Sequence, residues 1–329
     1  MRIETSAPTR IDLAGGTIDI WPLYLFHRGA QTINAAISIR ARVVVEPRTD
    51  GRVVLASLDT GVTVEAANYQ TLRDEPRLRL LALLAAHFEA ENLTLTTSSQ
   101  SPAGAGLAGS SALNVAVCAA LSEWKRQHHQ PEALLQIAMN VEAQTIGVPT
   151  GLQDYRPALY GGLAALELEV DGIHRVPLAA DLGELSRRIT LCYTGEPHNS
   201  GTNNWAITKA HIDGDRQVFA CFERIRDTAV RMREALVAGD WDGVGMAIDE
   251  EWENRRLLAP GVTTPVIEDL IARARRAGAT AAKVCGAGGG GCLFCYGPPD
   301  RRDDIRAALT GGGARLLEYH FEHEGLVRG

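Results

Sequence analysis

The sequence predicts an α+β protein that is built as two lobes. The chain has 329 residues, more than one compact core usually needs, so two lobes that share an interface are expected. Roughly the first hundred residues contain mostly strand-like runs, whereas the second half is richer in helical spacing. We place the boundary near residue 180, with an N-terminal lobe over 1–180 and a C-terminal lobe over 181–329.

In the N-terminal lobe, strands are predicted where apolar residues alternate or run together, and helices where they recur at helical spacing. The strands cover 3–14, 31–46, 93–97 and 163–170, and a hairpin over 52–66 turns at 59–61. The helices cover 78–90, 110–124 and 131–146, and Pro131 suits a first helical turn because its missing N–H costs nothing there. Residues 147–157 are expected to form a loop.

The C-terminal lobe is expected to add strands over 189–193, 281–285, 291–296 and 315–321. Its helices are predicted over 216–238, 241–258, 265–277 and 301–309, and Thr264 is the expected N-cap of the third. The alternation of Tyr319 and Phe321 with polar residues predicts an edge strand rather than a metal site at His320 and His323.

Composition and charge exclude several classes of function. The 33 basic and 40 acidic residues give a net charge of −7 with no basic stripe, so no nucleic-acid partner is expected. No apolar run approaches the length of a bilayer span, and no signal-peptide core is seen. The six cysteines lie mostly in apolar runs, as reduced, buried cysteines do, so we expect a cytoplasmic protein.

The central motif is a glycine-rich loop over 102–113 between a predicted strand and a predicted helix. Glycines let the backbone approach a phosphate closely, and the first free N–H groups of a helix point at an anion. Serine hydroxyls at the helix start can cap it, contact phosphate or complete a Mg²⁺ shell. The loop therefore predicts a phosphate site.

Two well-known glycine loops fit this segment poorly. The Walker A pattern G-x-x-x-x-G-K-[ST] needs a lysine directly after its second glycine, but Gly109 is followed by Ser110. Gly104, Gly106 and Gly109 do match a dinucleotide fingerprint, which would indicate a nicotinamide-dependent oxidoreductase. The preceding strand is threonine-rich, however, and the following helix leads into another helix rather than into a second strand.

The whole string over 102–113 resembles the ATP-phosphate motif of GHMP kinases, close to P-x-G-x-G-L-G-S-S-[AS]-A. Ala108 stands where that pattern has glycine, and Gly109 where it has the first serine, whereas both following serines are retained. The resemblance implies that the phosphates of ATP lie against Pro102, Gly104, Ala105, Gly106, Leu107, Ala108, Gly109, Ser110 and Ser111.

Residues 7–19, Ala-Pro-Thr-Arg-Ile-Asp-Leu-Ala-Gly-Gly-Thr-Ile-Asp, resemble the first motif of the same family in the form found in heptose and fucose kinases. The resemblance implies that Arg10 lies near the transferred phosphoryl group and the acceptor hydroxyl. It also implies that Gly16, Thr17 and Asp19 contact the substrate, and a carboxylate such as Asp19 can accept two sugar hydroxyls.

Residues 283–296 resemble the third family motif, K-x-[ST]-G-A-G-G-G-G. The glycines of this segment lie between two predicted apolar strands, whereas a flexible linker would be flanked by polar residues. This segment is expected to lie against the first motif and to wall the active site, with Gly286, Gly288 and Gly289 at the substrate. The string over 193–200 matches the family pattern T-G-x-x-R-x-S only in part, because His198 replaces the arginine.

Glu142, followed by Gly-Leu-Gln-Asp-Tyr at 151–155, resembles the E-x(n)-G-x-x-D element of the family. Phosphoryl transfer needs positioning and charge neutralisation more than covalent help. The resemblance implies that Glu142 and Ser110 bind Mg²⁺, and that Asp154 takes or orients the proton of the acceptor hydroxyl.

Together these motifs predict an ATP- and Mg²⁺-dependent kinase with a small-molecule sugar as its acceptor. The resemblance points to the anomeric hydroxyl, in a reaction like that of D-glycero-D-manno-heptose 7-phosphate 1-kinases. Fucose, a uronic acid or mevalonate remain open as acceptors, as does a sugar- or ATP-binding sensor without catalysis. The oligomeric state is also open, a homodimer included.

Overall fold

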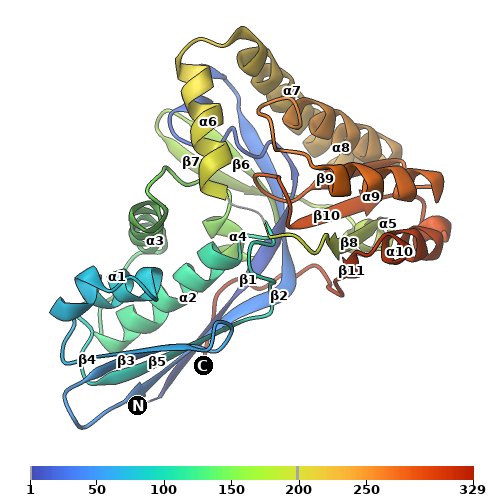
Figure 1. The fold of residues 1–329 in the computed structure, drawn as a ribbon. Helices are drawn as coiled ribbons and strands as arrows, with labels where there is room; N and C mark the ends of the chain where they lie inside the picture. The colour runs from blue at the N-terminus through green and yellow to red at the C-terminus, as the bar shows by residue number, and fades with distance from the viewer. Residues whose placement is uncertain (1, 198–199) are drawn as a thin grey trace.

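The computed structural model describes residues 2–197 and 200–329, which contain two β-sheets with helices packed on them (Figure 1). The first sheet has eight strands in the order β12-β1-β2-β5-β3-β4, and β6 and β7 continue from β2. Its strands are β1 (Ile3–Ala14), β2 (Gln31–Pro47), β3 (Val53–Ser57), β4 (Val62–Ala66), β5 (Leu93–Ser99), β6 (Leu163–Glu169), β7 (Gly172–Pro177) and β12 (Val327–Arg328).

Strands β1 and β2 form the spine of this sheet. The first residues of β2 pair with β6 and its last residues with β5, while β1 runs antiparallel along its other edge. From Ala7 to Ala14 every residue of β1 is buried, because α2 packs on this strand and α7 and α8 contact it as well. Arg10 and Asp12 are therefore charged residues held inside the molecule.

Helices α1 (Arg79–His87), α2 (Gly109–Trp124), α3 (Pro131–Ile146) and α4 (Tyr155–Tyr160) gather on one side of the first sheet (Figure 1). Of two 3-10 turns, η1 (Leu23–Phe26) lies between β1 and β2, and η2 (Gln70–Asp74) connects β4 to α1. Leu84, Leu95, Val115 and Leu135 belong to the apolar core that the helices and the sheet share.

The second sheet has the order β11-β8-β10-β9, and all its pairings are antiparallel. Its strands are β8 (Ile189–Tyr193), β9 (Ala281–Val284), β10 (Cys292–Tyr296) and β11 (Arg315–Leu316). The helices of this part are α5 (Leu182–Arg188), α6 (Ser200–Ile212), α7 (Arg216–Ala238), α8 (Trp241–Arg255), α9 (Pro265–Arg276) and α10 (Arg302–Gly311), with the turn η3 (Pro299–Arg301). Helix α8 packs on β9 and pairs with α7.

The α+β class is confirmed, and most predicted elements are present within a few residues. The hydroxyl of Thr264 accepts the N–H of Ile267 at 3.3 Å, as an N-cap does. Five helices and strands of the described residues have no counterpart in the sequence prediction: α4, β7, α5, α6 and β12. Helix α6 begins Ser-Gly-Thr-Asn, residues that favour caps and turns over helix interiors, so its pattern is weak and packing on α7 stabilises it.

Two predicted segments were wrong. The predicted loop over 147–157 ends early, because α4 begins at Tyr155. The predicted edge strand over 315–321 ends at Leu316, and Phe321 forms only an isolated bridge with Ile37. Beyond Leu316 the chain crosses to the first sheet, where the N–H of Ser38 donates to the carbonyl of His320 at 2.9 Å. The boundary near residue 180 stays a prediction.

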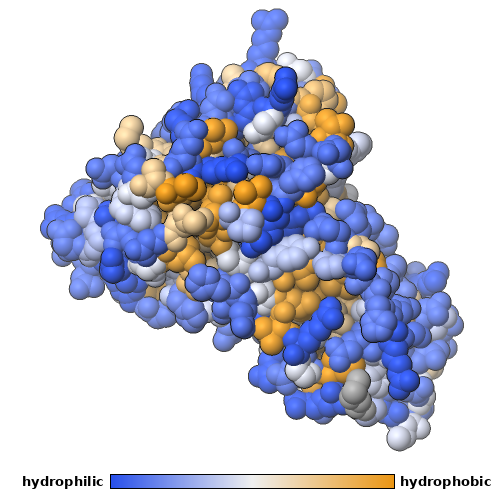
Figure 2. Space-filling view, turned by 180° about the vertical axis from the view of Figure 1, so that it is seen from behind, coloured by the Kyte–Doolittle hydropathy of each residue, from blue (hydrophilic) through white to orange (hydrophobic). Residues whose placement is uncertain are grey.

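The last residues return to the beginning of the chain. Strand β12 pairs with β1 through Thr5 and Ser6, so the two termini lie near each other (Figure 1). None of the helices in the described part of the chain has the length and apolar character that a bilayer crossing requires. Seen from behind, the surface is largely hydrophilic, with apolar residues gathered along the middle of that face (Figure 2). The six cysteines are free and buried, as expected.

Helix α2 begins with a strained residue. Its N-cap, Ala108, has φ +60°, the left-handed conformation that a glycine adopts without steric cost. The glycine next to it, Gly109, does not have a positive φ, so glycine and alanine stand in the reverse of the order that the backbone prefers. The glycine loop keeps this conformation nonetheless, because backbone hydrogen bonds hold it from β1 and from the third glycine segment, over 283–296.

We expect Ala108→Gly to stabilise the protein by about 0.5–1 kcal/mol, because it removes strain that exceeds the entropy added to the unfolded chain. Urea unfolding followed by circular dichroism measures this change. The matched control is Ala307→Gly, at an exposed position inside α10, which should lose about 1 kcal/mol. A loss of stability in both variants would contradict the strain at Ala108.

Candidate active site

A cavity of about 520 Å³ lies where the glycine loop, the end of β1 and the segment before α4 meet. It brings together residues that are far apart in sequence. Of the predicted site residues, those that line it are Arg10, Thr17, Asp19, Pro102, Gly104, Ala105, Gly106, Ala108, Gly109, Ser110, Ser111, Glu142, Asp154 and Gly286.

Four predicted site residues do not line the cavity. Leu107 is buried, and its carbonyl accepts the backbone N–H of Arg10 at 3.1 Å. A Cβ on Gly288 would lie 2.4 Å from the carbonyl oxygen of Val262, and the N–H of Gly289 donates to the same oxygen at 2.8 Å. Gly16, the fourth, lies against the side chains of Arg255 and Asp12. His198 lies outside the described residues.

Arg10 and Asp154 form an ion pair at the wall of the cavity. The Nε and Nη2 atoms of Arg10 donate to Oδ1 of Asp154 at 3.0 and 2.5 Å, and Nη1 donates to the carbonyl of Gly106 at 2.8 Å. Burial disfavours the charge of Arg10, but Asp154 and Asp12 outweigh it and raise the pKa of the guanidinium. Arg10 thus joins the acid at 154 to the glycine loop.

Glu142 points from α3 at the start of α2. Its Oε1 accepts the hydroxyl of Ser110 at 2.6 Å, and its Oε2 accepts those of Ser111 at 2.9 Å and Tyr155 at 2.7 Å. Burial raises the pKa of Glu142, and the three hydroxyl donors oppose that shift because they stabilise the carboxylate. Tyr155 directly follows Asp154, so one short segment supports both acidic groups.

Asp19 is buried, and none of the lysine and arginine side chains in the described residues forms an ion pair with it. Its Oδ2 accepts the backbone N–H of Gln153 at 2.8 Å, while its Oδ1 and the side-chain oxygen of Gln153 have no hydrogen-bond partner among residues 2–197 and 200–329. Burial, with the nearby charge of Asp154, raises the pKa of Asp19 to about 6. Buried acceptors without donors are costly, so this corner of the cavity is suited to a ligand that brings hydroxyl groups.

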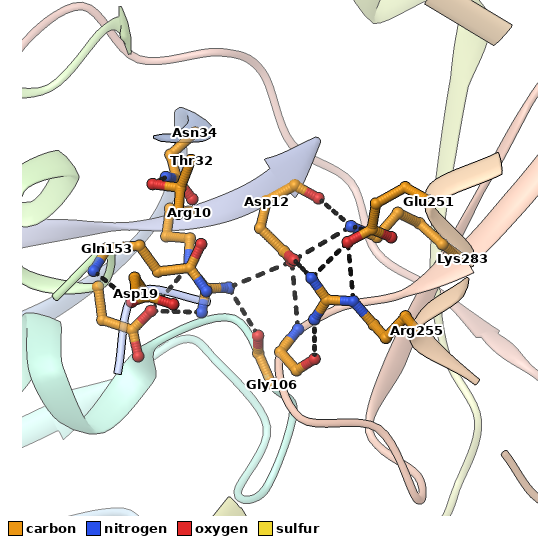
Figure 3. A network of polar contacts seen from close by, with 12 residues as sticks. Arg10, Asp12, Asp19, Thr32, Asn34, Gly106, Gln153, Glu251, Arg255 and Lys283 are labelled. Carbon is orange, nitrogen blue, oxygen red and sulfur yellow. Dashed lines mark hydrogen bonds and ion pairs between the residues drawn. The ribbon is translucent and has the colours of Figure 1, made fainter. Parts of the chain in front are cut away.

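Behind Arg10, the carboxylate of Asp12 lies among three cations (Figure 3). Lys283 donates to its Oδ2 at 3.1 Å, and Nη2 of Arg255 lies 3.2 Å from the same oxygen. Burial opposes its ionisation, yet the cations around it lower the pKa of Asp12 to about 2. Its Oδ1 also accepts the backbone N–H of Gly286 at 3.2 Å, which ties the third glycine segment to β1.

The third glycine segment also packs against the glycine loop over 102–113. A Cβ on Gly286 would lie 3.0 Å from the carbonyl oxygen of Gly106, and one on Gly291 would lie 2.8 Å from that of Ala105. The N–H of Cys292 donates to Ala105 at 2.7 Å. The segment over 283–296 therefore contacts both β1 and the glycine loop, and its Gly286 and Ala287 line the cavity.

Sequence reasoning missed several residues of this region. Ser57, Asp59 and Thr60, at the turn between β3 and β4, line the cavity, and Asp59 accepts the N–H of Ser99 at 3.0 Å. The turn was predicted, but nothing local shows which turn faces a cavity. Glu251 and Arg255 were also missed, because a Glu–Arg pair four residues apart usually indicates an exposed helix face.

We expect Asp19→Asn to change how stability depends on pH. Because the pKa of Asp19 is raised from 3.8 to about 6 on folding, its contribution to stability is full below pH 3.8 and is lost as the pH rises through about 6. The amide keeps the shape of the side chain without its charge. As the pH rises from about 4 to about 8, the free energy of unfolding of the variant should therefore increase by on the order of 2 kcal/mol relative to that of the wild type. Urea unfolding across this range measures the difference.

Asp74→Asn, which removes an exposed carboxylate outside the cavity, is the control. The difference in free energy of unfolding between this control and wild type should not vary with pH in this way. If the difference in free energy of unfolding between Asp19→Asn and wild type is also independent of pH, burial does not disfavour the charge of Asp19.

Two family models match the chain: GHMP kinases N terminal domain over residues 77–162 and GHMP kinases C terminal over 232–314. The N-terminal model covers the glycine loop, Glu142 and Asp154. The C-terminal model covers Glu251, Arg255 and the third glycine segment. Together they span just over half of the chain.

Among curated proteins, a D-glycero-alpha-D-manno-heptose 7-phosphate kinase from Campylobacter jejuni is 26% identical, over 98% of this chain and 98% of the relative. A mevalonate kinase from Thermococcus sibiricus is 27% identical, over 99% of this chain and 98% of its own. The crystal structure of a D-glycero-D-manno-heptose 1-phosphate kinase from Bacteroides thetaiotaomicron superposes with a TM-score of 0.80 at 24% identity, covering 99% and 98% of the two chains. Since both halves of the chain match and the fold agrees over its whole length, the chain belongs to the GHMP kinases, which are ATP-dependent phosphotransferases.

Proposed function

We propose that this protein is a sugar kinase that transfers the γ-phosphoryl group of ATP to an anomeric hydroxyl, like D-glycero-D-manno-heptose 7-phosphate 1-kinases. One observation carries the proposal: the Arg10–Asp154 pair and the Glu142–Ser110 pair line one cavity together with the glycine loop. A phosphate cradle, a carboxylate for a metal, and a carboxylate paired with arginine are the parts that phosphoryl transfer needs. The 26% identity over nearly the full length of a heptose 7-phosphate kinase supports the sugar acceptor.

ATP is proposed to lie with its phosphates on the loop over 102–111, and Mg²⁺ between Ser110 and Glu142. Among the described residues there is no cluster of three or more histidine, cysteine, aspartate or glutamate side chains that could hold a metal. Mg²⁺ suits such a site, because in kinases it takes few ligands from the protein and the rest from nucleotide phosphates and water. When bound, it neutralises charge on the phosphates.

Asp154 is the proposed base. Arg10 donates twice to Oδ1, which leaves Oδ2 as the oxygen for the acceptor hydroxyl. The geometry fixes the carboxylate from one side, so its second oxygen can take or orient the proton that the hydroxyl loses. Arg10, always charged, faces the same place and is proposed to stabilise the charge that develops on the transferred group.

The acceptor is proposed to lie beside Asp19, Thr17 and Gly286. Sugar hydroxyls would donate to the unpaired oxygens of Asp19 and Gln153, for which the described part of the chain provides no donor. Gly288 and Gly289 are proposed to act on the substrate only through the shape of their segment, because neither lines the cavity. A polyhydroxylated ligand satisfies these buried acceptors, whereas an apolar ligand leaves them unpaired.

A sugar without a phosphate, such as fucose, is the second candidate acceptor. Among the described residues, Arg10 is the one lysine or arginine that lines the cavity, and Asp154 already pairs with it. Residues 196–204 contain neither lysine nor arginine, and His198 stands where the family has an arginine. A phosphate on the acceptor would therefore lack the bidentate partner that such groups commonly have in proteins.

The deciding experiment measures ADP release from Mg·ATP with a panel of acceptors. The panel contains D-glycero-D-manno-heptose 7-phosphate, the same heptose without phosphate, fucose, a uronic acid and mevalonate. We expect release with a sugar, dependence on Mg²⁺, and a product phosphorylated at the anomeric carbon by ³¹P NMR. Turnover of mevalonate alone would replace the sugar, and binding of ATP without turnover of any acceptor would indicate a sensor.

We expect Asp154→Asn to lower kcat by about 10²–10⁴-fold, because the amide cannot act as a base, while the affinity for ATP barely changes. Steady-state kinetics, ATP titration and a thermal melt on the same preparation measure the three quantities. Asp74→Asn, a loss of the same charge at the surface, should leave all three unchanged. A folded Asp154→Asn enzyme with near wild-type kcat would remove Asp154 from the mechanism.

A further inference from the structure

We propose that Glu251 and Arg255 of α8 are positioning residues of the kinase reaction, which hold Arg10 and the Gly286 peptide in place through the carboxylate of Asp12. The inference rests on the proposed function and adds two residues to it that lie outside the cavity. Neither belongs to the three glycine motifs, and both are buried: Arg255 is 1% and Glu251 0% exposed.

Arg255 makes contacts in three directions (Figure 3). Its Nε and Nη2 donate to Oε1 of Glu251 at 2.8 and 2.5 Å, which fixes the plane of the guanidinium. Its Nη1 donates to the carbonyl of Gly286 at 2.7 Å, and its Nη2 lies 3.2 Å from Oδ2 of Asp12. Because Asp12 accepts the N–H of the same glycine, both polar groups of Gly286 are held from one side.

The link to the reacting groups runs through Asp12. Its Oδ1 lies 3.8 Å from Nη1 of Arg10, the nitrogen that also donates to the carbonyl of Gly106. Figure 3 shows the carboxylate of Asp12 between Arg10 on one side and Arg255 on the other. A change in the position of Asp12 therefore alters the guanidinium that holds Asp154.

The charges in this chain of contacts balance. Arg10, Arg255 and Lys283 carry three positive charges, and Asp12, Glu251 and Asp154 carry three negative ones. Removal of one partner of a buried pair leaves the other without compensation. Without Arg255, Asp12 would attract Arg10 more strongly and compete with Asp154 for it.

Gly16 supports this interpretation. A Cβ at this position would lie 2.2 Å from Nη2 of Arg255 and 2.8 Å from Oδ2 of Asp12. The glycine of the first motif therefore leaves room for the contact between α8 and β1. This explains why Gly16 belongs to the motif although it does not line the cavity.

The test compares a variant that keeps the positive charge at position 255 with a double variant that removes both charges of the Glu251–Arg255 pair. Arg255→Lys keeps the charge but cannot bond Glu251, Asp12 and Gly286 at once. The double variant Glu251→Gln/Arg255→Met removes the pair as a neutral unit and leaves Lys283 with Asp12. Misplacement of reacting groups by about 1 Å can cost 10²-fold, so we expect kcat to fall by about 10–100-fold while the Kd for ATP stays within about threefold.

The matched control is the exposed ion pair between Arg231 of α7 and Glu250 of α8, next to Glu251 in sequence. Arg231→Lys and the double variant Arg231→Met/Glu250→Gln make the same changes at the surface. They should leave kcat, the Kd for ATP and the melting temperature close to wild type.

A double-mutant cycle separates positioning from a general effect on the fold. If Arg255 acts through Arg10, then Arg255→Lys in an Arg10→Lys background should lower kcat by less than about twofold, because coupled residues are not additive. If Arg255 only stabilises the fold, its effect should be the same in both backgrounds and should follow the folded fraction. That result, or wild-type kcat in a folded Arg255→Lys enzyme, overturns the inference. Lack of turnover in the wild-type protein with every acceptor overturns the proposed function instead.

Discussion

The structure depends on one buried carboxylate. Asp12 lies inside the sheet at a point where the first strand, α8 and β9 meet, and cations from all three surround it. Charges in the interior are retained only when they are paired and hydrogen-bonded, so each element must stay where its partner is. The carboxylate thereby holds together parts of the chain that are more than two hundred residues apart, and its neighbours Arg10 and Gly286 line the cavity.

Three carboxylates at the cavity have different properties because their surroundings differ. Asp154 accepts two N–H groups of Arg10 at one oxygen, and Glu142 accepts three hydroxyl groups. Asp19 has neither a paired cation nor a full set of donors within the part of the chain that the structure describes. Desolvation, charge and hydrogen bonding shift acid pKa values in separable ways, so one residue type can serve in different roles. The proposed base, metal ligand and sugar contact correspond to these three environments.

Much of the fold and site could be predicted because the signals are local. Period-two and helical spacing predicted the long strands and most helices, and the glycine loop predicted a phosphate site by its own composition. Helix α6 and the end of the strand after Leu316 could not be predicted, since the neighbours that stabilise or divert these segments are distant in sequence. Glu251 and Arg255 were missed for the same reason: their spacing is that of an ordinary surface pair, and only packing shows that they are buried.

The sequence by itself determined most of the long strands and helices, which family pattern the three glycine segments follow, and which acidic residues are candidates for chemistry. Only the tertiary structure decided how they meet. It placed Arg10 on one oxygen of Asp154, set Glu142 against two serines, and removed Gly16, Gly288 and Gly289 from the cavity wall. The physical reason is that hydrogen bonds and desolvation act over a few ångströms in space, whereas a pattern in sequence reports only on neighbours along the chain.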